Sequence, residues 1–232
     1  MADITREQIE EILGSQGVSG LSLAGKDLSD LNLSGLNLTG VNLSGANLSK
    51  LVLKGGQVRQ ANLSGVNLSG ANLSKTNLNG SDLSRANLRD ATLSEVYLLR
   101  VNLEGGDLGH ANLLKAKMDE INLTGANLEK VNLDRTFLLR ANLSETNLSG
   151  ADLSGANLKD AVLAGANLTG AILRGAYLEK ANLRGADFRQ ADMLEVDLKL
   201  AEFDHETRWD DNFDPTAAGA VKGKKKKWLG LF

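Results

Sequence analysis

The sequence predicts a solenoid, in which the chain winds around one apolar axis, and three observations point to it. Every fifth residue from Leu23 to Phe203 is large and apolar; (203 − 23)/5 + 1 gives 37 such positions, of which 32 are Leu. A mostly small residue stands two places before each of them, and most units end in Gly or a polar residue. Self-similarity at a fixed period is typical of repeat architectures.

The period of five residues excludes the two simplest secondary structures. In an α-helix, five steps of about 100° would turn each Leu by about 140° from the last, so no apolar stripe would form. In an uninterrupted strand, an odd period would send alternate Leu residues to opposite faces. The chain must therefore turn a corner in every unit, and the Gly and polar residues at the unit ends are suited to such corners.

The repeated text ANLSG, ANLSK, ANLRD and ADLSG resembles the A(D/N)LXX motif of the pentapeptide repeat family, over about residues 21–204. The resemblance implies an all-β fold, a right-handed quadrilateral β-helix with four pentapeptides per coil. Thirty-seven units would then make about nine coils, roughly 43 Å long at the ~4.8 Å spacing of neighbouring strands. It also implies that Leu63, Leu83 and Leu103 stack inward and that Ala61 and Ala86 line the corners.

Both ends of such a stack need caps, and each end of the sequence supplies one. Thr5 and Gln8 have the spacing of a capping box, which predicts a short helix over residues 6–13. Trp209 and Phe213 are expected to cover the last coil, in a segment similar to the closing sequence of cyanobacterial family members. The expected organisation is an N-terminal helical cap (1–20), the β-helix (21–205), a C-terminal cap (206–221) and a basic and apolar tail (222–232).

The composition favours a non-enzymatic protein without a cofactor or metal. There is no Cys, so thiolate metal sites and Cys nucleophiles are excluded. The two histidines, His110 and His205, fall at outward positions far apart in the sequence. The string GLSLAGKD resembles a P-loop, but it carries Asp27 where Ser or Thr would bind magnesium, and a period of five makes its glycine spacing inevitable. With no signal peptide, the chain is expected to be cytoplasmic.

One side of the predicted coil carries three aromatic residues, each two coils from the next: Tyr97, Phe137 and Tyr177. The strings VYLLR and TFLLR add further apolar and basic residues to that side, namely Leu99, Arg100, Leu139 and Arg140. Aromatic and Arg side chains are enriched in interface hot spots, which favours a protein-binding surface. The alternative is drift within a 40-residue duplication, in which Tyr and Phe merely suit extended backbone.

The C-terminal string KGKKKKWLGLF joins five Lys to an apolar end. The candidate membrane contacts are Lys224, Lys225, Lys226, Lys227, Trp228, Leu229, Leu231 and Phe232. Such a segment fits an anionic membrane surface, which would place the protein at the periphery of a membrane. A solubilising extension fits it equally well, and nucleic acid is disfavoured because no basic face of the rod would continue the contact.

The sequence thus predicts a scaffold or protein-interaction module, with an unidentified protein partner and an anionic membrane surface as a second contact. The alternative comes from the family, which includes gyrase-protecting proteins thought to imitate DNA by an acidic surface. Residues 21–205 hold 21 acidic and 19 basic side chains, a net charge of 19 − 21 = −2. A mimic of duplex DNA, which carries a charge every ~1.7 Å, should be far more acidic.

Overall fold

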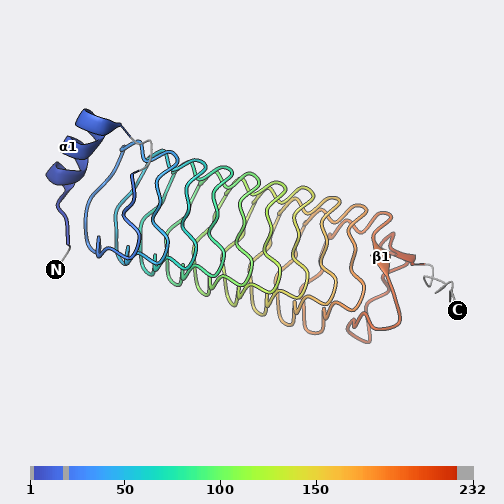
Figure 1. Ribbon diagram of the computed structural model, residues 1–232. Coiled ribbons are helices and arrows are strands. Elements are labelled where there is room, and N and C mark those ends of the chain that lie inside the picture. Colours follow the sequence, from blue (N-terminus) through green and yellow to red (C-terminus); the bar gives the residue numbers. More distant parts are fainter. Residues whose placement is uncertain (1–2, 18–20, 224–232) are drawn as a thin grey trace, which may run out of the picture.

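The computed structural model describes residues 3–17 and 21–223 of the chain. Figure 1 shows a rod of stacked coils, with the helix α1 (Arg6–Gln16) at the N-terminal end. The strands β1 (Glu202–Phe203) and β2 (Val221–Lys222) lie at the C-terminal end and pair in parallel. Between the two ends the chain turns so often that the coils are joined by single parallel bridges rather than by long strands.

The bridges fix the register of the coils. Each pairs a residue with the one 20 positions later, as in Ser22 with Asn42 and Tyr97 with Lys117. The backbone hydrogen bonds follow the same step, so that the Leu23 N–H donates to the Asn42 carbonyl at 2.7 Å. One coil therefore holds four pentapeptides, with one bridged side for each unit. This is the arrangement of a quadrilateral β-helix.

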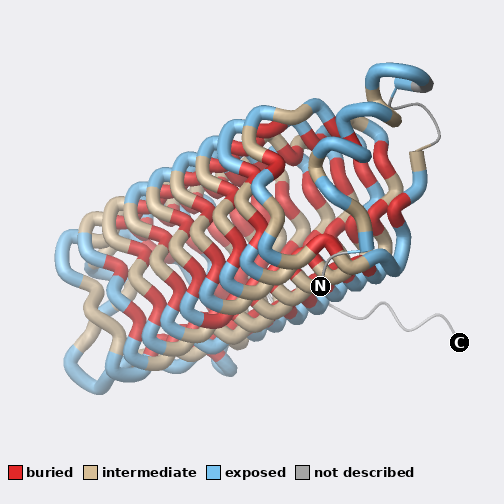
Figure 2. Tube along the Cα trace, turned by 90° about the vertical axis from the view of Figure 1, so that its left-hand side faces the viewer, coloured by how far each residue is buried: buried red, intermediate tan, exposed pale blue. Residues whose placement is uncertain are grey.

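Each side of a coil directs two side chains inward and one outward. The repeated apolar residue is buried at every unit from Leu23 to Phe188, and the small residue before it packs beside it. The polar residue between them faces outward, which gives the alternating burial in Figure 2. Some inward positions hold hydroxyls instead of Ala, and these are satisfied by carbonyls: Thr76 donates to Leu53 and Ser81 to Val58, both at 2.7 Å.

The corners are tight turns with a repeated pattern of hydrogen bonds. The N–H of Ala46 donates to the Leu43 carbonyl at 3.1 Å and closes the turn. The side chain of Asn42 accepts the N–H of Ser44, also at 3.1 Å, in an Asx turn that mimics a backbone turn. The last residue of the unit, Gly45, has a φ of 63°. Asn and Gly are thus the residues that the corner geometry favours.

Outward asparagines on one side form a ladder along the rod. The amide of Asn67 donates to Asn47 at 3.1 Å, and Asn87 donates to Asn67 at 3.2 Å. The next residue in line, Asp107, accepts from Asn127 at 2.9 Å. A carboxylate cannot donate to Asn87, so Asp107 ends one run of the ladder and begins the next.

The N-terminal cap has the capping box that the sequence predicts. Thr5 is the N-cap of α1, and Gln8 returns the hydrogen bond to the Thr5 backbone at 2.8 Å. The helix ends at Gln16 rather than near Leu13, because Gly17 closes it by donating to the Leu13 carbonyl. Ile9 is fully buried against the core of the first coils.

At the C-terminal end an extra residue breaks the repeat. Arg208 bridges Asp187, 21 positions away instead of 20. The chain then places Trp209 parallel to Phe188, with ring centroids 4.6 Å apart, and covers it with Phe213 at 5.3 Å. The expected lid of Trp209 and Phe213 is confirmed. The coil does not end at Asp204 as the sequence suggested, because β2, which includes Lys222, returns to pair with β1.

Candidate functional site

One line of bridged positions carries the exposed aromatic residues, and we call it the aromatic column. It consists of Tyr97, Lys117, Phe137, Asn157 and Tyr177, each bridged to the next. The three aromatic side chains are 39%, 46% and 48% exposed, in chain order. Equivalent positions on the opposite side of the coil carry the asparagine ladder. The column is therefore an apolar line on an otherwise polar side wall.

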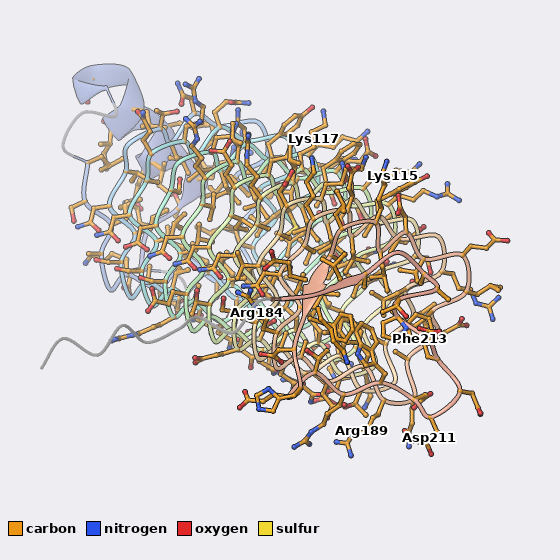
Figure 3. The ribbon with its side chains drawn as sticks, turned by 90° about the vertical axis from the view of Figure 1, so that its right-hand side faces the viewer. Lys115, Lys117, Arg184, Arg189, Asp211 and Phe213 are labelled. Atoms are coloured by element: carbon orange, nitrogen blue, oxygen red, sulfur yellow. The ribbon has the colours of Figure 1, made fainter. Side chains whose placement is uncertain are left out.

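The two gaps between the aromatic rings differ. In the gap between Tyr97 and Phe137, the ammonium group of Lys117 lies 4.5 Å from the centre of the Tyr97 ring. Figure 3 shows Lys117 and its neighbour Lys115 projecting from the side of the rod.

One repeat of the column further along, Asn157 and Gly155 replace these two lysines. Here the rings of Phe137 and Tyr177 flank a hollow of about 360 Å³, which Arg135 and Lys159 also line. The shorter side chains of this coil leave the second gap open. It is a shallow site with aromatic walls and a cationic rim.

The leucines beside the column are held by an unusual hydrogen bond. In a typical unit the Asn side chain accepts the N–H two residues later, but an aromatic ring cannot do so. The Leu99 N–H donates instead to Asn79 of the preceding coil at 2.9 Å. The Leu139 N–H donates to Asp119 in the same way, also at 2.9 Å. The aromatic substitutions are thus accompanied by replacement acceptors 20 residues before each Leu.

The two arginines beside the column share one carboxylate. Glu120 lies between Arg100 and Arg140, and each guanidinium approaches a different carboxylate oxygen at 2.7 Å. The hydrogen bond from Arg100 lowers the pKa of Glu120 below its usual value, and the second arginine adds to this, while partial desolvation opposes it. The three side chains form a fixed, charged border along the column.

The structure brings the sequence-predicted residues to one side of the rod. Tyr97, Phe137 and Tyr177 stand in one column, and Leu99, Arg100, Leu139 and Arg140 lie at the corner that follows it. Sequence reasoning missed Lys117, Asn157 and Glu120. The 20-residue step was the signal that could have found them, since they stand 20 residues from Tyr97, Phe137 and Arg100 respectively.

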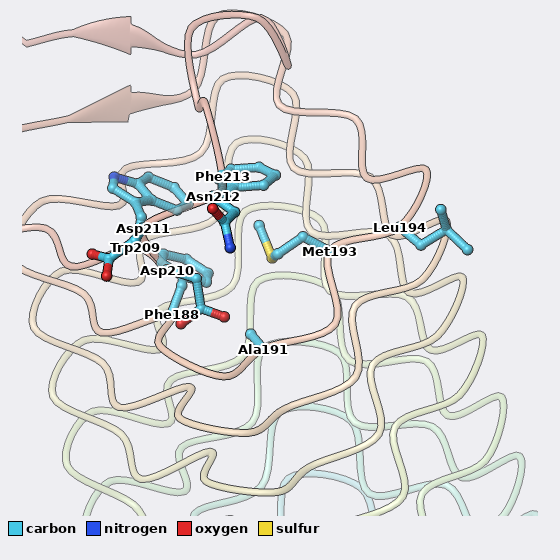
Figure 4. A pocket seen from close by; sticks show the side chains of 9 residues that line it. All are labelled: Phe188, Ala191, Met193, Leu194, Trp209, Asp210, Asp211, Asn212 and Phe213. Atoms are coloured by element: carbon cyan, nitrogen blue, oxygen red, sulfur yellow. The ribbon is translucent and has the colours of Figure 1, made fainter.

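A second hollow lies at the C-terminal end of the rod. Its volume is about 580 Å³, and Figure 4 shows the stacked rings of Phe188, Trp209 and Phe213 beside Met193. The indole N–H of Trp209 is buried and donates to no acceptor within the described residues. Stacking thus positions this side chain without a hydrogen bond. The expectation that the columns of Leu and Ala leave no cavity holds for the coils but not for this end.

Other kinds of site were sought in the described residues. Residues 3–17 and 21–223 contain no group of three or more His, Cys, Asp or Glu side chains placed to hold a metal ion. In the same part of the chain, no helix has the length and apolar character that crossing a bilayer requires. The candidate membrane contacts, from Lys224 to Phe232, lie outside the described residues.

The coil register, the inward Leu columns and the exterior column together define a parallel β-solenoid whose recognisable surfaces are on its outside. The chain belongs to the pentapeptide repeat family. The family model for pentapeptide repeats matches it in eight copies, over residues 27–65, 61–98, 97–133, 121–160 and 161–199. Because the family fold is a right-handed quadrilateral β-helix, the sequence-predicted fold class is supported. None of the curated proteins matches the chain in sequence.

Solved structures agree with this assignment. HetL, a pentapeptide repeat protein of the cyanobacterium Nostoc involved in the regulation of heterocyst differentiation, is 29% identical. That match covers 85% of this chain and 96% of HetL, with a TM-score of 0.64. Rfr23 of the cyanobacterium Cyanothece is 47% identical over 40% of this chain and 64% of its own, with a TM-score of 0.40. QnrB1, a plasmid-mediated fluoroquinolone resistance protein, is 18% identical over 82% of this chain and 92% of its own, with a TM-score of 0.39.

Proposed function

We propose that the protein is a non-enzymatic interaction module that binds a protein partner along the aromatic column. The observation that supports this is the concentration of exposed rings on one side of the rod. An exposed aromatic side chain gains little within a single coil, but it contributes strongly when a partner covers it. The similarity to HetL, a regulatory member of the family, is consistent with a role in binding rather than in catalysis.

The column has the composition of a binding site rather than of a random patch. Its rings are bordered by the Arg100, Glu120 and Arg140 cluster, which gives the apolar surface a polar rim. Interfaces commonly combine an apolar centre with such a rim. The replacement acceptors Asn79 and Asp119 keep the local backbone satisfied where the aromatic residues interrupt the Asn pattern. The rod therefore accommodates the rings at little cost to the coil.

The alternative function is inhibition or protection of a DNA topoisomerase by imitation of DNA. Charge argues against it, since the side positions carry mainly neutral Asn, and several carboxylates are paired with arginines. Glu120 binds two arginines, and Asp187 binds Arg189. A DNA supercoiling assay tests this alternative. Gyrase inhibition or protection from a quinolone at micromolar protein would favour it over the interaction module.

The proposal is tested by partner capture with a matched pair of variants. The double variant Tyr97→Ala with Phe137→Ala should keep the melting temperature of the parent but lose the captured partner. Ile172→Ala is the control, because Ile172 is also 39% exposed but lies on a different side of the coil. Equal capture by the double variant and the parent, with unchanged molecular mass in light scattering, would support the interpretation as sequence drift.

A further inference from the structure

The sides of the rod limit how a partner can bind the aromatic column. The backbone at Tyr97, Phe137 and Tyr177 is already bridged to the coils before and after it. A partner strand therefore finds no free N–H or C=O row along this side, and strand addition is excluded there. The partner must be recognised by side chains alone. What the column offers is a row of rings at a fixed spacing.

That spacing selects one kind of polypeptide. The rings are two coils apart, or about 9.6 Å, and the whole column from Tyr97 to Tyr177 spans about 19 Å. A polyproline II helix repeats every three residues, and at 3.1 Å each this gives about 9.3 Å, or roughly 18.6 Å for two repeats. An α-helix repeats its face every seven residues, or about 10.5 Å, and drifts by almost 2 Å over the column. The polyproline II repeat stays in register with the rings and the α-helix does not.

The open gap provides the pocket for one residue of such a segment. Phe137 and Tyr177 form its walls, while Asn157 and Gly155 leave its floor low. The side-chain oxygen of Asn157 accepts the Lys159 N–H at 3.3 Å, while its amide nitrogen makes no hydrogen bond within the described residues. Polyproline II carbonyls have no internal partners, so this amide can donate to one of them. Aromatic walls and a free donor are the two features that a proline-rich segment needs.

We propose that the hollow between Phe137 and Tyr177 receives a proline of a partner segment that runs along the rod in the polyproline II conformation. This inference rests on the proposed function, and it names the chemistry of the partner. The rim of the hollow contains Arg135 and Lys159, so acidic residues beside the proline would add to binding. In the neighbouring gap, Lys117 covers the Tyr97 ring and reduces the space for a second proline.

The internal repeat supplies the test. Isothermal titration calorimetry with a peptide of ten prolines should show binding to the parent protein, and a ten-residue Gly-Ser peptide should show none. Asn157→Lys copies the residue that the rod already holds at Lys117, so it should fold normally and weaken decaproline binding by about tenfold or more. Phe137→Ala should weaken it to a similar extent. Lys117→Asn should open the second gap and strengthen binding several-fold.

Two outcomes would overturn the inference. One is a parent protein that binds decaproline no better than the Gly-Ser peptide. The other is a set of affinities that Asn157→Lys and Phe137→Ala leave unchanged, which would place any peptide elsewhere. Partner capture separates these failures from that of the proposed function. If the Tyr97 and Phe137 double variant loses its partner while decaproline fails to bind, the interaction role stands and only the proline-rich partner is rejected.

Discussion

The last residue of each pentapeptide has a left-handed backbone conformation whether or not it is Gly. Lys50, Arg100 and Leu200 have φ values of 57°, 54° and 60°, and 17 other non-Gly residues resemble them. This conformation costs an L-residue roughly 1–2 kcal/mol. None of these 20 residues is β-branched. The corner thus accepts any flexible outward side chain but selects against branching next to the backbone.

Gly125 allows a test of this selection, since a Cβ added there would meet nothing within 4 Å. Its φ is 64°, so any effect of substitution comes from the backbone and not from a clash. Gly125→Val should lower the free energy of unfolding by about 2 kcal/mol, and Gly125→Lys by about 1 kcal/mol or less. Urea denaturation of the two variants measures the difference. Equal losses would show that branching at Cβ has no special cost at this corner.

At the scale of one side of the rod, the outward asparagines differ in how many neighbours they bind. Asn147 donates to Asn127, accepts from Asn167, and accepts the backbone N–H of Ser149. Asn132 makes only the local bond, from the Asp134 N–H. The first residue links three successive coils, whereas the second stabilises only its own corner.

This difference predicts unequal effects of the same substitution. Asn132→Ala should lower the free energy of unfolding by about 1 kcal/mol, because one hydrogen bond is lost. Asn147→Ala should cost roughly 1 kcal/mol more, since its bonds to both neighbouring coils are lost as well. Chemical denaturation followed by circular dichroism gives both values. If the two variants lose the same stability, the ladder contributes nothing beyond the local turns.

The elements also differ in how well the sequence predicts them. The period of five determines which residues face inward, because only one turn per unit keeps Leu23 and its successors on one axis. It does not determine four units per coil, since the corner angle depends on backbone torsions that any period could share. The hollow beside Asn157 was out of reach for a related reason. It depends on which side chains stand 20 residues apart and on how Lys117 lies over Tyr97.

For the whole molecule, stability depends on the unbroken Leu columns. Leu103 and Leu123 are fully buried one coil apart, and neither has a polar neighbour that could pair with a charge. Leu103→Asp or Leu123→Asp should therefore cost more than about 4 kcal/mol and melt the array at much lower temperature. Ser44→Asp, at an outward position, should change the melting temperature by a few degrees at most. Similar losses from the inward and outward substitutions would contradict the assignment of faces.

The C-terminal segment adds a prediction that is independent of the coils. Five Lys between Lys222 and Lys227, followed by an apolar end, should bind anionic vesicles, and salt should weaken the binding. Neutral vesicles should bind poorly. A chain ending at Gly223 keeps β2 and the complete rod, so it should retain the circular dichroism spectrum but lose vesicle binding. Equal sedimentation of the two proteins with anionic vesicles would leave the segment a solubilising role.

The constant register gives the rod the properties of a ruler. Each coil moves the chain forward by one step of about 4.8 Å, so positions that differ by multiples of 20 are graduations on one line. The aromatic rings occupy every second graduation between Tyr97 and Tyr177. Insertion or loss of one 20-residue coil would shift everything beyond it by a single graduation and leave each remaining contact in register. Evolution can therefore adjust the distance between two surface groups on this scaffold without redesigning its core.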